Sequence, residues 1–176
     1  MHRFIAIILF ATVAFAQTPQ KPKARTLREV LLEQLHTTHD QEDWFVPIKI
    51  AVEGVTPEQA KWTDGKGNHS VGQLANHLAF WNELALEAFQ GKPRQYKGTN
   101  DETFNSFDAK SWASVVKRLD DVMKAWERAV ENADDAKLAE GASQIAHVGA
   151  HNAYHVGQII YVRKLQGNWD PAKGVK

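Results

Sequence analysis

Hydrophobic residues recur at intervals of three and four in four separate segments of the chain, and this spacing is typical of amphipathic helices. The first segment begins at Thr26, which together with Glu29 forms the pattern of a capping box. Its apolar stripe continues through residues 27–52, but Pro47 interrupts it. Because proline removes a backbone hydrogen bond and clashes with the preceding turn, we predict a kink at residues 43–47 or two helices in series.

The other three segments each predict one helix. The second begins with a capping box formed by Ser70 and Gln73 and ends before Gly91. The third covers about 111–133 and carries the strongest stripe, and the fourth is expected from about Ser143 to Gly167. We find no alternating run that convincingly predicts a strand.

Four helices with one apolar face each can bury those faces only against one another. The predicted fold class is therefore all-α, a four-helix bundle. The connection between the second and third helices, about 91–110, is longer than the 2–8 residues usual in bundles. It can cross the bundle or cover one end, so a strict up-down-up-down topology does not follow.

The N-terminal residues have the pattern of an export signal. A cationic start is followed by an apolar run and by small residues at Ala14 and Ala16, which predicts a signal peptide over 1–16. The alternative, a membrane anchor, needs about 20 apolar residues, more than this run has. We expect a flexible leader at 17–25, the bundle at 26–168 and a C-terminal tail at 169–176. The mature protein would be exported, periplasmic or extracellular, with no stable membrane anchor after cleavage.

Composition narrows the classes of function. The chain has 176 residues, with 21 basic and 21 acidic side chains, and this balance argues against nucleic acid as a partner. With no cysteine, disulfides and thiolate chemistry are excluded. A metal site would have to use histidine, carboxylate or amide ligands.

Histidines are the main candidates for chemistry. His147, His151 and His155 are spaced four residues apart, which places successive imidazoles nearly in line on a helix. His151 and His155 project toward the core and His147 falls near the edge of that face, while His77 projects toward the core from the second helix. Each buried imidazole could bond to a backbone carbonyl or a polar side chain. For three of them, each costing about 1–3 kcal/mol if left unpaired, a shared metal ion is favoured.

Two stretches of sequence resemble a known family. Residues 70–81 (SVGQLANHLAFW) and 151–159 (HNAYHVGQI) are similar to the two signature helices of the DinB-like superfamily, which includes metal-dependent hydrolases and bacterial thiol S-transferases. The resemblance covers about 27–167. It implies a helical bundle in which His77, His151 and His155 are the metal ligands. No ligand role is carried over to His147. Because members of the family often pair through helix faces, it also implies a possible homodimer.

A site with three neutral imidazoles has chemical consequences of its own. The fourth position of the metal stays open for water or substrate, which is the pattern of catalytic rather than structural zinc. Zinc, nickel and iron all suit these ligands, so the cofactor is predicted only as a divalent metal ion. Asn152 stands where a HExxH metalloprotease needs its glutamate, which disfavours a protease.

Three further residues adjoin the predicted ligands: Gln158, Asn76 and Tyr154. Gln158 is close enough on its helix to orient an imidazole, although a half-exposed boundary position would also suit it. No catalytic residue beyond the metal ligands is identified. The protein is predicted to be a metal-dependent enzyme, a hydrolase or thiol-dependent transferase acting on an unidentified small molecule. The alternative is a non-catalytic metal-binding or structural protein, and export counts against thiol transfer because small thiols are mainly cytoplasmic.

Overall fold

A computed structural model describes residues 24–174, and these residues form helices, turns and loops without any strand. The predicted all-α class and four-helix bundle are confirmed. The long helices are α1 (Leu27–His39), α4 (Val71–Phe89), α6 (Trp112–Asn132) and α7 (Asp135–Leu165). The short ones are α2 (Ile48–Val52), α3 (Pro57–Lys61) and α5 (Asn100–Asn105), with 3₁₀ turns η1 (Ala109–Ser111) and η2 (Pro171–Lys173). Within residues 24–174, no helix combines the length and hydrophobicity needed to cross a membrane.

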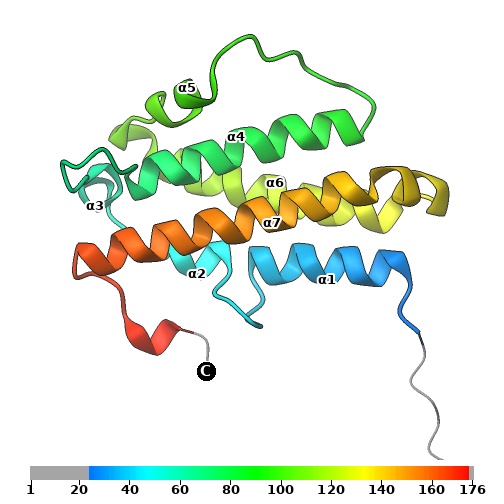
Figure 1. Ribbon diagram of the computed structural model, residues 1–176, viewed down its shortest axis with the longest axis horizontal. Coiled ribbons are helices and arrows are strands. Elements are labelled where there is room, and N and C mark those ends of the chain that lie inside the picture. The colour runs from blue at the N-terminus through cyan, green and yellow to red at the C-terminus, as the bar shows by residue number, and fades with distance from the viewer. Residues whose placement is uncertain (1–23, 175–176) are drawn as a thin grey trace, which may run out of the picture.

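The four long helices form a ring of contacts. Both α1 and α4 pack against α6 and α7, so α1 and α4 occupy opposite corners of the bundle (Figure 1). After α4 the chain returns over this helix before α6 begins, and α4 and α6 therefore run in the same direction (Figure 1). The long connection thus crosses the bundle, and α5 within it packs on α4.

Apolar side chains from all four long helices fill the centre of the bundle. Leu35 of α1, Leu78 of α4, Trp126 of α6 and Ile159 of α7 have no exposed surface. Burial of a large apolar side chain contributes about 1.5–3 kcal/mol, so this core supplies the main force that holds the helices together.

The two predicted capping boxes are confirmed at atomic detail. Thr26 accepts a hydrogen bond from the backbone of Glu29, whose carboxylate accepts one from the backbone of Thr26. Ser70 and Gln73 form the same reciprocal box at the start of α4. At Pro47 the structure has two helices in series rather than a kink, because α1 ends at His39 and α2 begins directly after the proline.

Two details of the predicted helices were wrong. The last helix begins at Asp135 rather than near Ser143, because Asp134 accepts a hydrogen bond from the backbone of Lys137 and caps an earlier start. The apolar stripe predicted over residues 27–52 includes Leu27 and Val30, yet 44% and 46% of their surfaces are exposed. The core face of α1 begins only at the next residue, Leu31.

The predicted signal peptide, residues 1–16, and most of the predicted leader lie outside the described residues. The predicted C-terminal tail contains η2, and the nearby Trp169 packs against the hydrophobic core. The guanidinium of Arg163 lies 5.2 Å from the centre of the Trp169 ring, which ties this segment to α7.

Candidate metal centre

The structure brings the three predicted ligands together between α4 and α7. His77 comes from the middle of α4, while His151 and His155 lie one turn apart on α7. One nitrogen from each ring lies within 4.8 Å of the others, and the Nε2 atoms of His77 and His151 are 3.2 Å apart. His77 and His155 are buried and His151 is half-buried.

The orientation of His77 is determined by α5. The hydroxyl of Thr103 donates to the backbone oxygen of Asn100, at 2.6 Å, so its lone pairs remain to accept a hydrogen bond. Nδ1 of His77 lies 2.6 Å from this hydroxyl oxygen. The proton of neutral His77 is therefore on Nδ1, and the lone pair of Nε2 points toward His151.

Gln158 holds His155 in the equivalent way. Its side-chain oxygen lies 2.6 Å from Nδ1 of His155, and its amide nitrogen donates to the hydroxyl of Tyr154 at 3.2 Å. A carbonyl oxygen can only accept, so Nδ1 of His155 carries the proton and Nε2 is left with a lone pair. Partners of this kind fix the tautomer and ring orientation of histidine ligands in metal sites.

The electrostatic environment keeps all three rings neutral near pH 7. Burial, followed by repulsion from His155 and His151, lowers the pKa of His77 to about 3. Burial is also the main cause that lowers the pKa of His155 to about 4, and it lowers the pKa of His151. Neutral imidazoles are the form that binds metal ions.

An aromatic ring from the crossover connection closes one side of the centre. Phe104 of α5 stacks on His77 with ring centres 3.8 Å apart and on His69 with centres 3.9 Å apart. Phe104 itself is buried. Its ring therefore shields His77 from water and restricts the motion of the imidazole.

On another side the centre opens into a cavity of about 630 Å³. His77 and His151 line this cavity together with other side chains, among them Trp81, Gln144 and His147. A cavity of this volume is within the range that holds small molecules. Among the described residues that line it, Glu140 alone has a formal charge.

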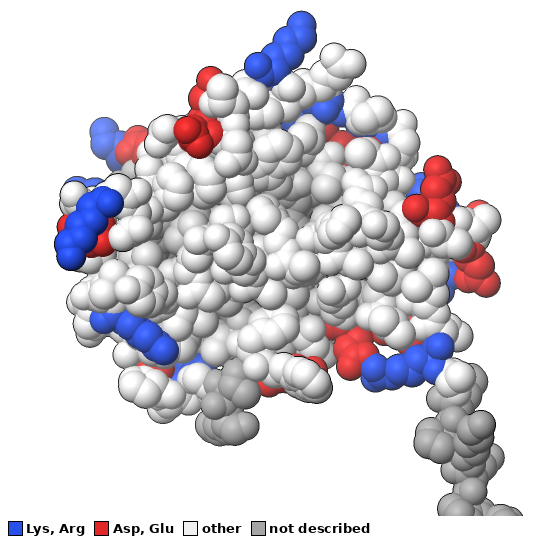
Figure 2. Space-filling view, in the orientation of Figure 1, with Lys and Arg blue, Asp and Glu red and all other residues white. Residues whose placement is uncertain are grey.

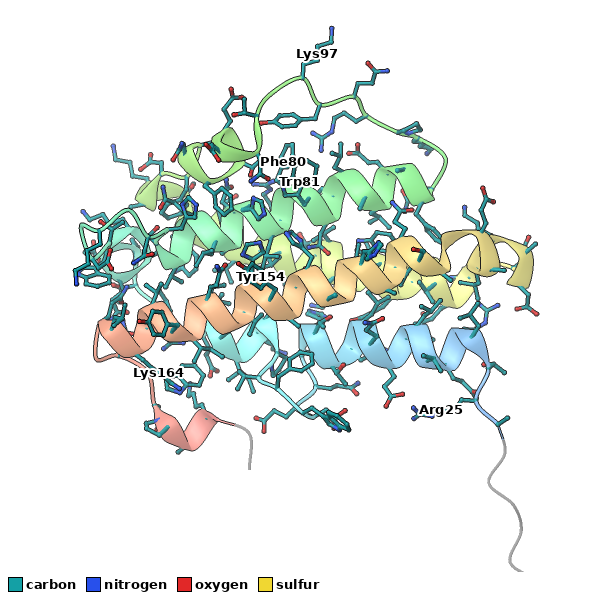
Figure 3. The ribbon with its side chains drawn as sticks, viewed as in Figure 1. Arg25, Phe80, Trp81, Lys97, Tyr154 and Lys164 are labelled. Atoms are coloured by element: carbon teal, nitrogen blue, oxygen red, sulfur yellow. The ribbon has the colours of Figure 1, made fainter. Side chains whose placement is uncertain are left out.

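Figure 3 shows Phe80 and Trp81 on the side of α4 that carries the crossover connection, and Tyr154 on α7 near the seam with α4. In Figure 2, which has the same orientation, charged side chains gather toward the edges of this face and few lie near its centre. The sequence agrees with this picture, since residues 141–162 of α7 contain no charged side chain.

The remaining sequence candidates have different surroundings. Asn76 donates to the backbone of Thr103 and to the hydroxyl of Ser106, so it anchors the crossover connection to α4. Tyr154 is 63% exposed, and its ring lies edge-on to His155. Asn152, in the position of a protease glutamate, is fully buried and pairs with Asn82 between α7 and α4.

Sequence reasoning missed Thr103 and Phe104. Both lie in the non-periodic connection, where the hydrophobic pattern gave no reason to expect a contact with the histidines. The only local signal was Thr99, whose hydroxyl accepts from the backbone of Glu102 and starts α5. A helix start in a long connection indicates an ordered segment, but it does not say what that segment covers.

The donor set fits a divalent transition metal. Tetrahedral zinc with bonds of about 2.0–2.1 Å to nitrogen requires its ligands to be about 3.3 Å apart, close to the observed 3.2 Å between two Nε2 atoms. Three neutral nitrogens suit zinc, nickel or iron better than magnesium or calcium, which prefer oxygen ligands.

Comparison with known proteins assigns the family. A sequence profile of the DinB superfamily matches residues 48–159, more than half of the chain. The protein therefore belongs to the DinB superfamily, as the resemblance predicted. No curated protein and no solved structure gives a significant match.

Proposed function

We propose that this protein is a metal-dependent enzyme, a hydrolase or thiol-dependent transferase, whose metal ion is held by His77, His151 and His155. One observation carries the proposal. Three neutral imidazoles converge from two helices, and for His77 and His155 the outer nitrogen is already hydrogen-bonded, so that Nε2 faces the common centre. Such preparation of ligands is typical of metal centres.

The residues of the site divide the work between binding, orientation and exclusion of water. The three histidines hold the ion, Thr103 and Gln158 fix two of the rings, and Phe104 covers one flank. A divalent ion held by three protein ligands supplies a Lewis acid with an open coordination position. The cavity beside His77 and His151 gives a small substrate access to that position.

The cavity also favours a certain kind of substrate. Its walls offer the aromatic surface of Trp81, the amide of Gln144 and the imidazole of His147, and no lysine or arginine of residues 24–174 lines it. We therefore propose a small substrate that carries no phosphate group. A non-catalytic metal-binding protein is the second candidate, and the shortage of acidic or basic groups beside the centre favours it.

The first experiment tests the metal centre. Wild-type protein and the His151→Ala variant are each loaded with zinc and passed over a desalting column. The variant should retain one zinc ion per chain fewer than the wild type. Exposed His147 provides the matched control, because His147→Ala should keep that zinc. Equal zinc content in wild type and His151→Ala would overturn the proposal.

The second experiment separates enzyme from binding protein. Zinc-, nickel- and iron-loaded forms are assayed on a panel of small esters, amides and thiol adducts. Turnover that disappears in His151→Ala supports catalysis. Stoichiometric metal binding without turnover, together with a closed coordination sphere in X-ray absorption spectra, supports the non-catalytic candidate.

We also propose export, supported by the pattern of residues 1–16. Expression of the full chain in a bacterial host, followed by N-terminal sequencing of the periplasmic and secreted fractions, tests it. A mature chain beginning at Gln17 is expected. Intact protein that remains in the cytoplasm would contradict the proposal.

A further inference from the structure

A second cluster of metal-ligating side chains lies between α1 and α6, away from the helix pair that holds the three-histidine centre. His36 and Asp40 are four residues apart at the C-terminal end of α1, and Glu127 faces them from α6. One donor atom from each lies within 4.8 Å of the others, and Nδ1 of His36 is 3.4 Å from Oε1 of Glu127. We propose that these three residues form a second divalent-metal site.

The position of the Glu127 carboxylate is fixed by a buried histidine. His39 is 1% exposed, and its Nδ1 lies 2.6 Å from Oε1 of Glu127. On its other side, Nε2 of His39 lies 3.1 Å from Oδ1 of Asp120. In metal sites, carboxylate ligands are commonly held in place by hydrogen bonds from residues that do not themselves bind the metal. His39 holds the carboxylate of Glu127 in this way. The bond from His39 uses one lone pair of Oε1, so the other lone pairs of the carboxylate are left for a cation.

Charge and access both suit a cation. Asp40, Asp120 and Glu127 bring three carboxylates, of which Asp40 pairs with Lys49 at 4.0 Å and Asp120 with Lys124 at 2.6 Å. Among residues 24–174, the ion-pair partners of Glu127 are the histidines His36 and His39, and neither a lysine nor an arginine pairs with it. The side chains of His36 and Asp40 are 29% and 33% exposed, so an ion can enter from solvent. The C-terminal end of a helix also carries partial negative charge.

The donor set distinguishes this site from the three-histidine centre. One imidazole and two carboxylates form a harder ligand set than three imidazoles, and carboxylates suit manganese. Donor atoms around an ion with bonds of about 2.0–2.2 Å lie about 3–4 Å apart. Modest side-chain rotations of the half-exposed Asp40 and His36 would bring the three donor atoms to this separation. An ion bound there would connect the end of α1 to α6.

The test uses Mn²⁺ and a chain that lacks the first centre. In the His151→Ala background, Mn²⁺ titration followed by electron paramagnetic resonance should show one bound ion per chain. Adding either His36→Ala or Asp40→Asn should weaken that binding at least tenfold. The matched control is Asp121→Asn, an exposed acidic residue of α6 outside the cluster, which should leave binding unchanged.

Thermal unfolding gives a second readout. Mn²⁺ should raise the unfolding midpoint of His151→Ala but not that of His151→Ala with Asp40→Asn. If His151→Ala takes up no Mn²⁺, or if His36→Ala and Asp40→Asn bind it as well as the control, the cluster is an ion-pair network only and the proposal is overturned. Because the three-histidine centre is already removed in this background, these outcomes are independent of the proposed function.

Discussion

Hydrogen bonds at Nδ1 of His77 and His155 determine that Nε2 is the nitrogen available to a metal. The partner of His77 is the hydroxyl of Thr103 from α5, and the partner of His155 is the side-chain amide of Gln158, one turn along α7. Both partners act at Nδ1, so both rings present Nε2 to the common centre. The low pKa values of these rings follow from the same burial that excludes water from them.

Replacing Thr103 by valine tests whether Thr103 orients the imidazole of His77. Valine keeps the volume but removes the acceptor, which leaves a buried N–H unpaired. We expect a loss of about 1–3 kcal/mol in the free energy of unfolding without metal, and a loss of about 10–100-fold in zinc affinity. Urea denaturation and competition with a zinc-binding dye measure the two effects.

Two variants control this prediction. Thr103→Ser keeps the hydroxyl and should bind zinc nearly as well as wild type. Thr37→Val removes a hydroxyl of α1 that bonds to the backbone of Gln34, and it should leave zinc affinity unchanged. If Thr103→Val binds zinc with wild-type affinity, Thr103 does not orient His77.

At the scale of elements, α4 and α7 pack closely where α7 has a glycine, Gly141, facing α4. A Cβ atom at Gly141 would lie 2.6 Å from the ring of Phe89 at the end of α4, whereas a Cβ at Gly157 would meet nothing within 4 Å. Both glycines lie in the interior of the same helix, where alanine is intrinsically favoured by about 1 kcal/mol. They therefore form a matched pair that separates helix propensity from packing.

We predict opposite effects of alanine at these two positions. Gly157→Ala should raise the free energy of unfolding by about 1 kcal/mol. Gly141→Ala should lower it, because overpacking against the buried Phe89 costs about 1–3 kcal/mol and exceeds the gain in propensity. Urea denaturation of metal-free protein measures both. A stabilising Gly141→Ala would show that Phe89 moves aside without cost.

The same elements show how far sequence carries the interpretation. Capping boxes and periodicity predicted where α1, α4 and α6 begin, because these signals act within a few residues. The convergence of His77 with His151 and His155 was also accessible, since helical projection places all three toward the core. The contact of Thr103 with His77 was not, because 26 residues separate them and only the path of the crossover connection brings them together.

At the scale of the whole molecule, the crossover makes α4 and α6 parallel and carries α5 onto the metal centre (Figure 1). The topology was left open by the sequence because a long connection fits either of two paths. The acid-base groups of the bundle are also divided between its two sides. Neutral histidines lie between α4 and α7, and a charged histidine-carboxylate network lies between α1 and α6. The histidines of the two groups respond to pH in opposite ways.

Between α4 and α7, acid is destabilising. The folded-state pKa values of His77 and His155, about 3 and 4, lie below the ordinary value of 6.5. As pH falls below about 6.5, these histidines become protonated in the unfolded chain but not in the folded chain. The free energy of unfolding therefore declines until the pH is below the folded-state pKa values.

Between α1 and α6 the sign is reversed for the histidine. Burial alone would lower the pKa of His39, but its hydrogen bonds to Glu127 and Asp120 outweigh burial and raise it above 6.5. This contribution to stability is therefore complete below pH 6.5 and is lost as pH rises through the folded-state pKa. Burial alone would raise the pKa values of Glu127 and Asp120, but the hydrogen bond to His39 lowers that of Glu127 below 4.5, and hydrogen bonds to Lys124 and His39 lower that of Asp120 below 3.8. Their contribution to stability is therefore lost in acid.

The network between α1 and α6 should consequently be strongest between about pH 4.5 and 6.5. We predict that His39→Gln lowers the free energy of unfolding more at pH 6 than at pH 9, by about 1.4 kcal/mol for each unit by which the network raises the pKa of His39. Urea denaturation with a chelator present gives the difference at each pH. His147→Gln, exposed on α7, is the control and should show no such trend. If the effect of His39→Gln is the same at pH 6 and pH 9, His39 gains no proton on folding and acts in the bundle only as a neutral hydrogen-bonding group.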